Sequence, residues 1–490
     1  MLYKGIDNLL NQIGVHLQLS LNKFNELKKN YDALSKYINN QHILSSDDGS
    51  IYVQGSFSTD TMIKPIHKEE VDVDVVCVFD DEWKPGIHVQ PFYDKLVDVF
   101  SEGRYKEITE EYKNVVRINY VNNYHFDIMP TLPLSNDNKG NIKAVDTNKS
   151  KWIDRAPYPY SQWFLQRSSL LTGKSVDKNY TVIDKGLYNV IKDMAVDTLE
   201  KPSDYYTKPP LNRVVQLIKR ARDIFFRDDE EFVPQSIVIT TLVAEKYDGE
   251  MNLGKSLLDA ATYFYNLAKS KMNFRVSNPV YDKEEFTDKW HISQEFYINF
   301  RKFSYWLVYH VRNLFSDNPR VIEKSVIQLF GSNVYDKVST SKFTSYLNSG
   351  LVLHNDRRLE QEEVIQDKYK MDLTSYVEID CTYTNKRYNY SKNLRLSDKK
   401  MMVLPNSSLK FYVSDTDVQG QYEVLWKVRN VGHKALERNM VRGSIESGFG
   451  DEKRESADFV GYHFVECYIV QGGKVVAADR IDVPIGVRLS

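Results

Sequence analysis

Residues 71–79, with the sequence VDVDVVCVF, place acidic and apolar side chains in alternation at the period of a β-strand. Successive side chains of a strand point to opposite faces, so Asp72 and Asp74 share one face. The other face is wholly apolar and must pack against a layer of helices. It consists of Val71, Val73, Val75, Cys77 and Phe79. The segment therefore predicts a strand with a helical layer on one side and two carboxylates on the other.

The carboxylates suggest a cation site. Like charges two residues apart on one strand repel each other, which raises their pKa values unless a cation lies between them. Carboxylate oxygens suit Mg²⁺ or Mn²⁺. In YHFDIMP (124–130), Asp127 alternates with Phe126 and Ile128 and is the polar side chain of its face. If this strand pairs beside residues 71–79, three carboxylates converge. They could then hold two divalent ions that clamp a triphosphate and activate a hydroxyl.

Gly55-Ser56 follows the strand-like IYVQ and precedes FSTDTMI, which is typical of a short helix. Glycine lets a phosphate approach the backbone, and successive N–H groups and the Ser56 hydroxyl can donate to it. Taken alone, an Asp-x-Asp pair is usually a solvated strand face, and Gly-Ser is usually a turn. Together with Asp127 they favour a metal-dependent nucleotidyltransferase site.

The pattern of apolar residues along the chain changes twice. Apolar residues at spacings of three and four predict a helix over 4–40, and short strands with one intervening helix (91–100) predict a mixed sheet. Helical patterns then dominate, and strand patterns return near Tyr376, with a hairpin at Gly472-Gly473. The charged segment 353–372 indicates a helical connector or an exposed linker. The predicted fold is α+β, with domains at 1–155, 156–372 (helical) and 376–490 (all-β).

Composition excludes several classes of protein. Lys and Arg total 65 against 67 Asp and Glu, which gives a net charge of −2. This charge excludes a protein that binds nucleic acid through a surface that is basic all over, but it does not exclude a local basic groove. No apolar run approaches the ~20 residues of a membrane span, and the N-terminus lacks the pattern of a signal peptide. The three cysteines have no CxxC spacing. We therefore expect a cytoplasmic protein with no membrane partner.

The stretches QGSFSTDTMIKP, EEVDVDVVCVF and HFDIMPTLP resemble the catalytic core of the polymerase-β-like nucleotidyltransferases. More narrowly, they resemble the bacterial cGAS/DncV-like nucleotidyltransferases of the SMODS family. IKAVDTNKSKWIDRAPYPYSQWF, LNRVVQLIKRARDIFF and VPQSIVITTLVAEKY extend the resemblance over about 50–330. It implies that Asp72, Asp74 and Asp127 are catalytic and bind two Mg²⁺ or Mn²⁺ ions. It also implies that Gly55 and Ser56 bind the nucleotide.

The resemblance adds Lys219 and Ser236 as nucleotide contacts. By their own patterns, Lys219 belongs to a basic run that indicates a solvated helix face, and Ser236 after Pro234 indicates a helix cap. Gln54 is either a strand-end residue or a nucleotide contact. The absence of a Cys/His zinc insertion argues against direct sensing of double-stranded DNA.

The C-terminal segments QYEVLWKVRNVGHKALERNMVRG and YHFVECYIVQGGKVVAADRIDVPI resemble the AGS-C domain, a β-rich module with a presumed sensor role. A regulatory ligand or nucleic acid is therefore a candidate partner of residues 376–490. Two interpretations stay open for its basic residues: a solvated strand face, which is the commoner case, or an anion or nucleic-acid site. The residues concerned are Arg429, His433, Arg438 and Arg442.

The resemblance implies an enzyme that joins NTPs into a cyclic di- or oligonucleotide messenger and releases pyrophosphate. The messenger would act on a separately encoded effector in antiphage defence of the CBASS type. Three alternatives remain: synthesis of linear ribo- or deoxyribo-oligonucleotides, transfer of a nucleotide onto a protein or RNA acceptor, and a catalytically silent nucleotide-binding module. The presence of all three carboxylates counts against the last.

Overall fold

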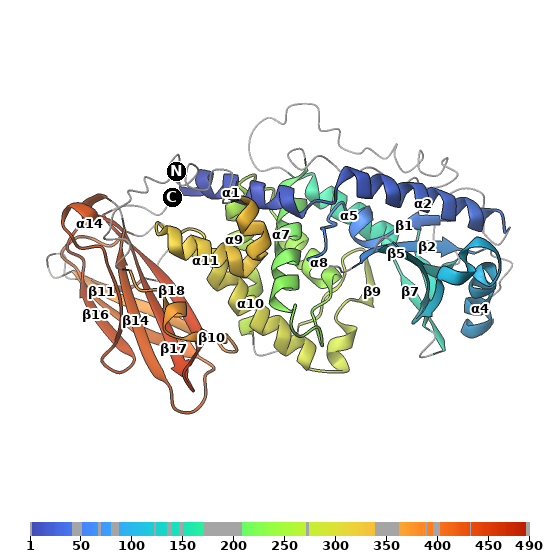
Figure 1. The fold of residues 1–490 in the computed structure, drawn as a ribbon. Coiled ribbons are helices and arrows are strands. Elements are labelled where there is room, and N and C mark those ends of the chain that lie inside the picture. The colour runs from blue at the N-terminus through green and yellow to red at the C-terminus, as the bar shows by residue number, and fades with distance from the viewer. Residues whose placement is uncertain are drawn as a thin grey trace. The chain divides into compact units, whose positions relative to one another are not determined.

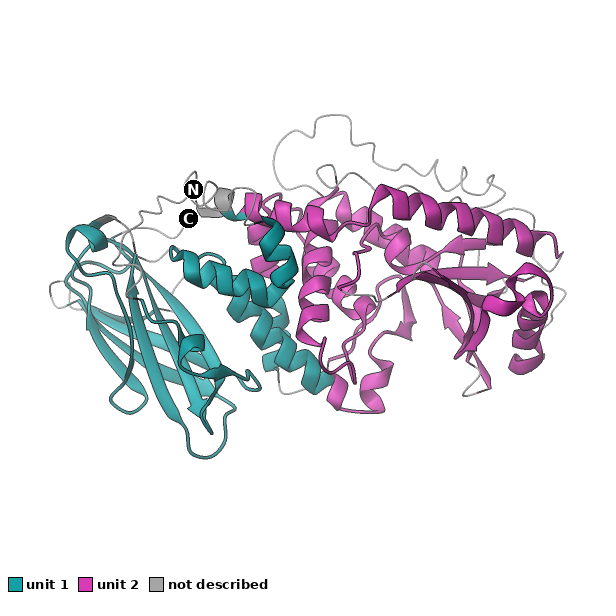
Figure 2. Cartoon of the chain, in the orientation of Figure 1, with its two compact units in different colours: residues 1–6, 261–272, 297–490 teal, residues 7–260, 273–296 magenta. Residues whose placement is uncertain are grey.

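The computed structural model divides into two compact units, which are described separately (Figures 1 and 2). Unit 1 contains residues 1–6, 261–272 and 297–490, and unit 2 contains residues 7–260 and 273–296. The structure describes residues 2–41, 51–66, 70–79, 88–121, 124–134, 140–146, 150–170, 208–270, 274–338, 362–385, 387, 390–394, 402–431 and 433–486. Within these ranges no helix is long and apolar enough to cross a membrane.

The N-terminal helical segment is two helices, so the prediction of one helix over 4–40 is wrong in this respect. α1 spans Leu2–Leu17 and α2 spans Leu21–Asn39. Ser20 has an extended backbone, and its side chain accepts a hydrogen bond from the N–H of Lys23. This is an N-cap, which satisfies a backbone donor that the start of a helix leaves without a partner.

Unit 2 contains the expected mixed sheet, with β2 and β5 as its parallel pair at the centre. The order is β1 (Ile51–Val53), β2 (Val71–Val78), β5 (Tyr124–Pro133), β4 (Val115–Tyr120) and β3 (Thr109–Tyr112). β6 (Ile142–Asp146) pairs with β5, and β7 (Lys151–Arg155) pairs with β6. The short elements α3 (Gly55–Ser58) and η1 (Gly103–Ile108) precede β2 and β3. β3 and β7 lacked a clear pattern in the sequence, because their side chains are mostly polar or half-exposed.

The apolar face of β2 packs against α2 and α4 (Val89–Phe100). Val73, Val75 and Cys77 are fully buried in this core. The helices contribute Phe24, Leu27, Tyr31, Leu34, Phe92 and Leu96. Burying one such side chain stabilises the fold by roughly 1.5–3 kcal/mol, so exposing the apolar face of β2 to water would cost several such contributions. The carboxylates of β2 therefore face away from the core.

The rest of unit 2 is mainly helical. It contains α5 (Pro157–Ser168), α7 (Pro210–Phe225), α8 (Ser236–Lys246) and the first part of α9 (Leu253–Lys269). A small hairpin of β8 (Ser277–Asn278) and β9 (Tyr281–Glu285) follows, then η2 (Asp288–His291). α7 is buried on its polar side as well as its apolar side, so the predicted solvated face is wrong for Lys219 and Arg220.

Unit 1 combines α10 (Glu295–Asn313, whose first two residues belong to unit 2) and α11 (Pro319–Phe330) with two packed sheets. One sheet has the order β10 (Lys370–Met371), β18 (Lys474–Ile485), β17 (Gly461–Gln471), β14 (Glu423–Asn430) and β15 (Arg442–Ser447). The other has the order β12 (Tyr390–Asn393), β11 (Val377–Asn385), β13 (Ser408–Thr416) and β16 (Glu452–Ser456). η3 (Ile365–Asp367) and α14 (His433–Glu437) are short additions. Gly472 and Gly473, both with positive φ, form the expected hairpin between β17 and β18.

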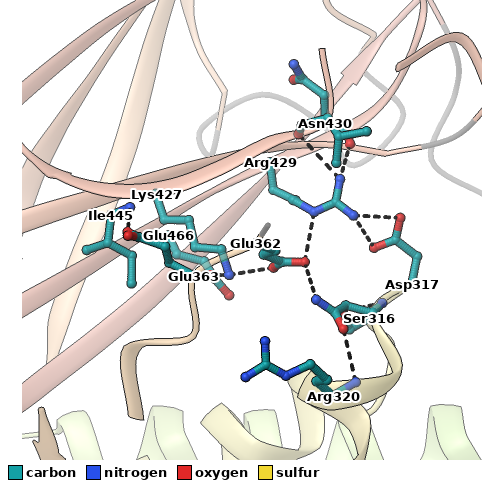
Figure 3. A network of polar contacts seen from close by, with 12 residues as sticks. Ser316, Asp317, Arg320, Glu362, Glu363, Lys427, Arg429, Asn430, Ile445 and Glu466 are labelled. Atoms are coloured by element: carbon teal, nitrogen blue, oxygen red, sulfur yellow. Dashed lines mark hydrogen bonds and ion pairs between the residues drawn. The ribbon is translucent and has the colours of Figure 1, made fainter. Parts of the chain in front are cut away.

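A buried ionic network in unit 1 corrects two expectations (Figure 3). Glu362 is only 3% exposed, so the prediction of an exposed linker is wrong at this residue. Its carboxylate lies 2.6 Å from Lys427 Nζ and 3.0 Å from Arg429 Nε. Arg429 also binds Asp317, at 3.0 Å, and is fully buried. It is therefore neither a solvated residue nor an accessible anion site.

The other C-terminal basic residues do not form a common site with Arg429. Arg442 forms an ion pair with Glu455. Arg438 lies 5.4 Å from the ring centroid of Phe459, within the range of a cation–π contact. The side chain of His433, like residue Gly432, falls outside the described part of the chain. Arg429 and Arg442 thus form their described ion pairs with acidic side chains of unit 1.

Candidate functional site

Three carboxylates meet on one face of the central sheet in unit 2. β2 and β5 pair in parallel with Asp74 opposite Asp127, and Asp72 opposite His125. Paired residues of adjacent strands project to the same face, so this register brings the three predicted aspartates together. Asp72 is exposed, whereas Asp74 and Asp127 are half-buried.

Asp74 carries the least favourable charge of the cluster. Burial, followed by the negative charges of Asp127 and Asp72, raises the pKa of Asp74 to about 7. Burial and the nearby Arg222 lower the pKa of Lys219 to about 8. The site therefore holds an acid and a base whose pKa values are both shifted toward neutral pH. Such perturbed groups mark positions where a bound ligand would restore the balance of charge.

Arg117 on β4 holds Asp127. Its Nε donates to Asp127 Oδ1 and its Nη2 to Asp127 Oδ2, both at 2.7 Å. The guanidinium also lies 3.8 Å from the ring centroid of Tyr112. Sequence reasoning did not select Arg117. Only the pairing of the two strands reveals Arg117, because it lies directly opposite Asp127 on an adjacent antiparallel strand.

His125 is the second cationic neighbour of the cluster. Its Nε2 lies 3.0 Å from Asp72 Oδ1, and its Nδ1 lies 2.8 Å from Glu70 Oε2. Burial opposes its protonation, but the carboxylates of Asp72 and Glu70 outweigh it and raise the pKa of His125. His125 precedes Asp127 by two residues and so shares its face, which was the signal that sequence reasoning passed over.

The donor set fits a divalent cation in part. Among the described residues, no three His, Cys, Asp or Glu side chains are arranged to hold a metal ion as they stand. Both oxygens of Asp127 are bound to Arg117, which accounts for this. Asp72 and Asp74 are hard oxygen donors, and burial together with the neighbouring carboxylates raises the pKa of Asp74, which a bound cation would offset. These two residues fit Mg²⁺ or Mn²⁺, and Asp127 would join them only by leaving Arg117.

Gly55 is required by its close approach to Asp74. It has φ +68, and a Cβ at this position would lie 2.7 Å from Asp74 Oδ2. Any other residue would therefore combine backbone strain with a clash against the carboxylate. The N–H of Gln54 donates to the Asp74 carbonyl at 2.9 Å, which attaches the turn to β2. The predicted strand is confirmed by β1, but the short helix predicted for FSTDTMI is wrong in its position, because α3 begins at Gly55 and ends at Ser58.

A cleft of about 380 Å³ brings most of the predicted residues together. Gly55, Ser56, Asp72, Asp74, Lys219 and Ser236 line it, with Arg222 beside them. An adjoining cavity of about 470 Å³ shares Gly55, Asp74 and Tyr160 with the cleft and is also lined by Gln54. Asp127 lines neither cavity in this structure. Gln54 keeps both of its predicted interpretations, since it directly follows the last residue of β1 and also lines a cavity.

The two helical contacts predicted by resemblance lie at the cleft. Lys219 is 7% exposed, and its Nζ donates to the Thr61 carbonyl at 3.2 Å. Ser236 is the first residue of α8, and its hydroxyl accepts a hydrogen bond from Arg222 Nη1. Sequence reasoning named the basic run containing Arg222 but did not select it. Its separation of three residues from Lys219 places the two on the same side of α7.

Comparison with known proteins agrees with this geometry. Residues 6–167 match the model of the Second Messenger Oligonucleotide or Dinucleotide Synthetase (SMODS) domain. Residues 359–486 match the Adenylyl/Guanylyl and SMODS C-terminal sensor domain (AGS_C). The two matches together cover more than half of the 490 residues.

Two curated relatives are similar over much of the chain. A c-di-GMP synthase of Roseivirga ehrenbergii is 25% identical over 350 residues, covering 69% of this chain and 87% of the relative. The cyclic dinucleotide synthase CdnG of Bradyrhizobium diazoefficiens is 21% identical over 304 residues, covering 59% of this chain and 71% of the relative.

A solved structure shares the fold. The structure of B. diazoefficiens CdnG in complex with GTP superposes with a TM-score of 0.54 at 18% identity, covering 69% of this chain and 98% of that chain. The predicted polymerase-β-like core, together with the C-terminal all-β domain, is thereby confirmed. The protein therefore combines a SMODS domain with a C-terminal AGS_C domain, as the resemblance in its sequence predicted.

Proposed function

We propose that this chain joins nucleoside triphosphates into a cyclic di- or oligonucleotide messenger by metal-dependent phosphoryl transfer. The observation that carries the proposal is the register of β2 and β5, with Asp74 opposite Asp127 and Gly55 packed against Asp74. Support for a cyclic product comes from relatives named as a c-di-GMP synthase and a cyclic dinucleotide synthase. The GTP complex of CdnG supports a nucleotide as the substrate.

In the proposed reaction, the 380 Å³ cleft holds the triphosphate of the donor nucleotide. The Ser56 hydroxyl donates to a phosphate oxygen, Lys219 neutralises phosphate charge, and Ser236 helps to position the group. Arg222 supplies a further positive charge at the same wall. These groups act by positioning and by electrostatic stabilisation, which are the main contributions a protein makes to phosphoryl transfer.

Asp72 and Asp74 would hold the divalent ions. When bound, such ions neutralise charge on the phosphates and lower the pKa of the attacking hydroxyl. Asp127 would bind the ion at the acceptor nucleotide, and that ion would help to lower the pKa of the ribose hydroxyl. The hydroxyl oxygen forms a bond to the α-phosphorus, the bond to the bridging oxygen breaks, and pyrophosphate leaves. The hydroxyl proton passes to water.

Arg117 orients the Asp127 carboxylate through its two-point contact. The hydrogen bonds that Arg117 donates to Asp127 raise the pKa of Arg117, so its guanidinium stays charged. We expect Asp127 to exchange this contact when the cation and the acceptor are present. His125 would orient Asp72 through the single contact of its Nε2 with Asp72 Oδ1.

The test uses the full chain with four α-labelled NTPs, and separately four dNTPs, in Mg²⁺ or Mn²⁺. Products are treated with phosphatase and resolved by chromatography and mass spectrometry, beside the double variant Asp72→Asn/Asp74→Asn. A small phosphatase-resistant product that the variant fails to make, with the mass of a ring, is the expected result. A linear product or a labelled macromolecule would replace the proposal by the corresponding alternative. Nucleotide binding without turnover would indicate a silent module.

Two partners complete the proposal. The product would act on a separately encoded effector, and the domain at 376–490 would regulate the enzyme in response to its own ligand. The AGS_C model describes a sensor domain, which supports the second point. Activity assays with and without added nucleic acid would test whether that ligand is a nucleic acid.

A further inference from the structure

The connector between α3 and β2 is held by side chains rather than by a sheet. Residues 61–65 of this connector have no regular secondary structure, although it joins Gly55-Ser56 to the aspartates of β2. Its backbone carbonyls therefore lack the partners that a helix or strand would supply. Buried carbonyls without partners are costly, so the donors that satisfy them are a structural requirement.

One face of α7 supplies two of these donors as amides. Asn212 Nδ2 donates to the Thr59 carbonyl at 2.9 Å, and Gln216 Nε2 donates to the Met62 carbonyl at 2.6 Å. Residues four apart lie on the same side of a helix, so both amides face the connector. Both side chains are almost completely buried, with exposed fractions of 1% for Asn212 and 0% for Gln216.

The same face continues with two cationic donors. Lys219 Nζ donates to the Thr61 carbonyl, and Arg220 Nη2 donates to the Lys64 carbonyl. The spacing from Gln216 to these residues is three and four, which keeps them on the side that carries the amides. α7 and the connector thus run in the same direction, joined by a ladder of side-chain to backbone hydrogen bonds.

Lys208, just before α7, fixes the start of the connector. Its Nζ lies 2.6 Å from Asp60 Oδ1 and donates to the Asp60 carbonyl at 3.0 Å. Asp60 has φ +49, a left-handed conformation that disfavours a residue with a Cβ. The ion pair holds this strained residue, since the Lys208 side chain is completely buried and Asp60 is its acidic partner.

The ladder connects directly to the cleft. Thr59 Oγ1 donates to the Gly55 carbonyl at 2.9 Å, and the Thr61 N–H donates to the Ser56 carbonyl at 2.9 Å. α7 itself carries Lys219 to the cleft wall. A single helix thus sets the position of the Gly-Ser turn relative to its own cationic residue.

We propose that Lys208, Asn212 and Gln216 are positioning residues for nucleotidyl transfer, acting through the connector. None of the three lines either cavity, so none is expected to touch a substrate. This inference rests on the proposed function for its kinetic consequence. A displacement of about 1 Å at reacting groups can cost about 100-fold in rate, so a loosened connector lowers kcat more than it weakens binding.

The experiment compares Gln216→Met with Gln166→Met in the full chain. Methionine preserves the length of the Gln216 side chain and removes its donor, while Gln166 lies exposed on α5. We expect Gln216→Met to lower kcat by about 10- to 100-fold with KM changed less than about threefold. Hydrogen–deuterium exchange of residues 59–66 should become faster in Gln216→Met and stay unchanged in Gln166→Met.

Wild-type kcat together with wild-type exchange in Gln216→Met would overturn the inference, as would a change confined to KM. Asn212→Ala is the second variant, for use if Gln216→Met does not fold, and the same two measurements decide it. If the wild-type chain lacks nucleotidyl transfer, the proposed function fails, but faster exchange of residues 59–66 would still establish the ladder. The two failures are therefore distinguishable.

Discussion

The molecule contains two clusters of charge that differ in balance. In the cleft of unit 2, Asp74 faces two further carboxylates, and burial and these charges raise its pKa to about 7. In unit 1, Glu362 is only 3% exposed, yet Lys427 and Arg429 outweigh the effect of burial and lower its pKa. The charged form of Lys427 is favoured as well, because Glu466 and Glu362 raise its pKa against the effect of burial.

The comparison separates a structural role from a functional one. A buried carboxylate with cations and hydrogen-bond donors around it is already satisfied, and its removal would leave those cations uncompensated. A buried carboxylate among other carboxylates is unsatisfied until a ligand arrives. Both clusters are built from Asp, Glu, Lys and Arg, so residue type alone does not distinguish them.

The largest expected effect is the loss of activity in Asp74→Asn. Removal of this carboxylate should reduce nucleotidyl transfer by at least about 10³-fold, because a preorganised charge at the reacting phosphates is lost. The same substitution should stabilise the metal-free protein, by about 1 kcal/mol, since it removes a disfavoured charge. Product assays and thermal unfolding in EDTA measure the two effects. Reduced stability of Asp74→Asn would contradict the difference in charge balance between the Asp74 and Glu362 clusters.

The second-largest expected effect is a change of stability in Glu362→Gln that has the opposite sign to the change expected for Asp74→Asn. We expect a loss of stability of about 3 kcal/mol, because Lys427 and Arg429 would stay buried without their shared anion. Urea unfolding measures it. The control is Asp367→Asn, which removes the ion pairs of an exposed carboxylate with Arg320 and Lys324 and should change stability by less than about 1 kcal/mol. Equal effects in both variants would contradict the structural role of the network.

The third effect is opposite pH dependence. The folded pKa of Asp74 is raised, so its unfolded form releases a proton first, and stability falls as pH rises from about 4 to about 7. Glu362 has a lowered folded pKa, so its contribution is present above its usual pKa and is lost as pH falls below that value. Unfolding of wild type and Asp74→Asn at pH 4.5–7.5 in EDTA should show a steeper decline of stability in the wild type than in the variant.

The smallest effect concerns Arg117. Arg117→Met frees both oxygens of Asp127, so nucleotide-free protein should bind Mn²⁺ more tightly, by about fivefold, as one competing charge-assisted contact is removed. Titration calorimetry with Mn²⁺ measures it. Lys143→Met, which changes a half-exposed cation of β6, is the matched control. Unchanged or weaker binding would indicate that Arg117 orients Asp127 for the ion instead of competing with it.

Local periodicity accounts for the successful predictions of the fold. The alternation in 71–79 identified β2, assigned its apolar face to the helical layer and placed Asp72 and Asp74 on the other face, as observed. A strand pattern depends on neighbours two residues away and is therefore visible in the chain. The single helix over 4–40 was wrong because apolar spacing continues across Ser20, although the helix restarts there.

The other wrong predictions concerned charged residues. Arg429 resembled a surface cation, and Lys219 in its basic run resembled a solvated one, yet both are buried. Whether a cation is buried depends on partners such as Glu362 or the Thr61 carbonyl, which are distant in sequence. Arg117 escaped notice for the same reason, since only strand pairing brings it to Asp127.

The sequence by itself determined the strand faces, the Gly-Ser turn, the three aspartates and the family resemblance, because these depend on local period and on motif spacing. Only the tertiary structure decided that Asp74 lies opposite Asp127, that α7 holds the connector, and that one charged cluster is balanced while the other is not. The physical reason is that pKa values and buried hydrogen bonds depend on distance in space, and contacts between remote segments exist only after folding.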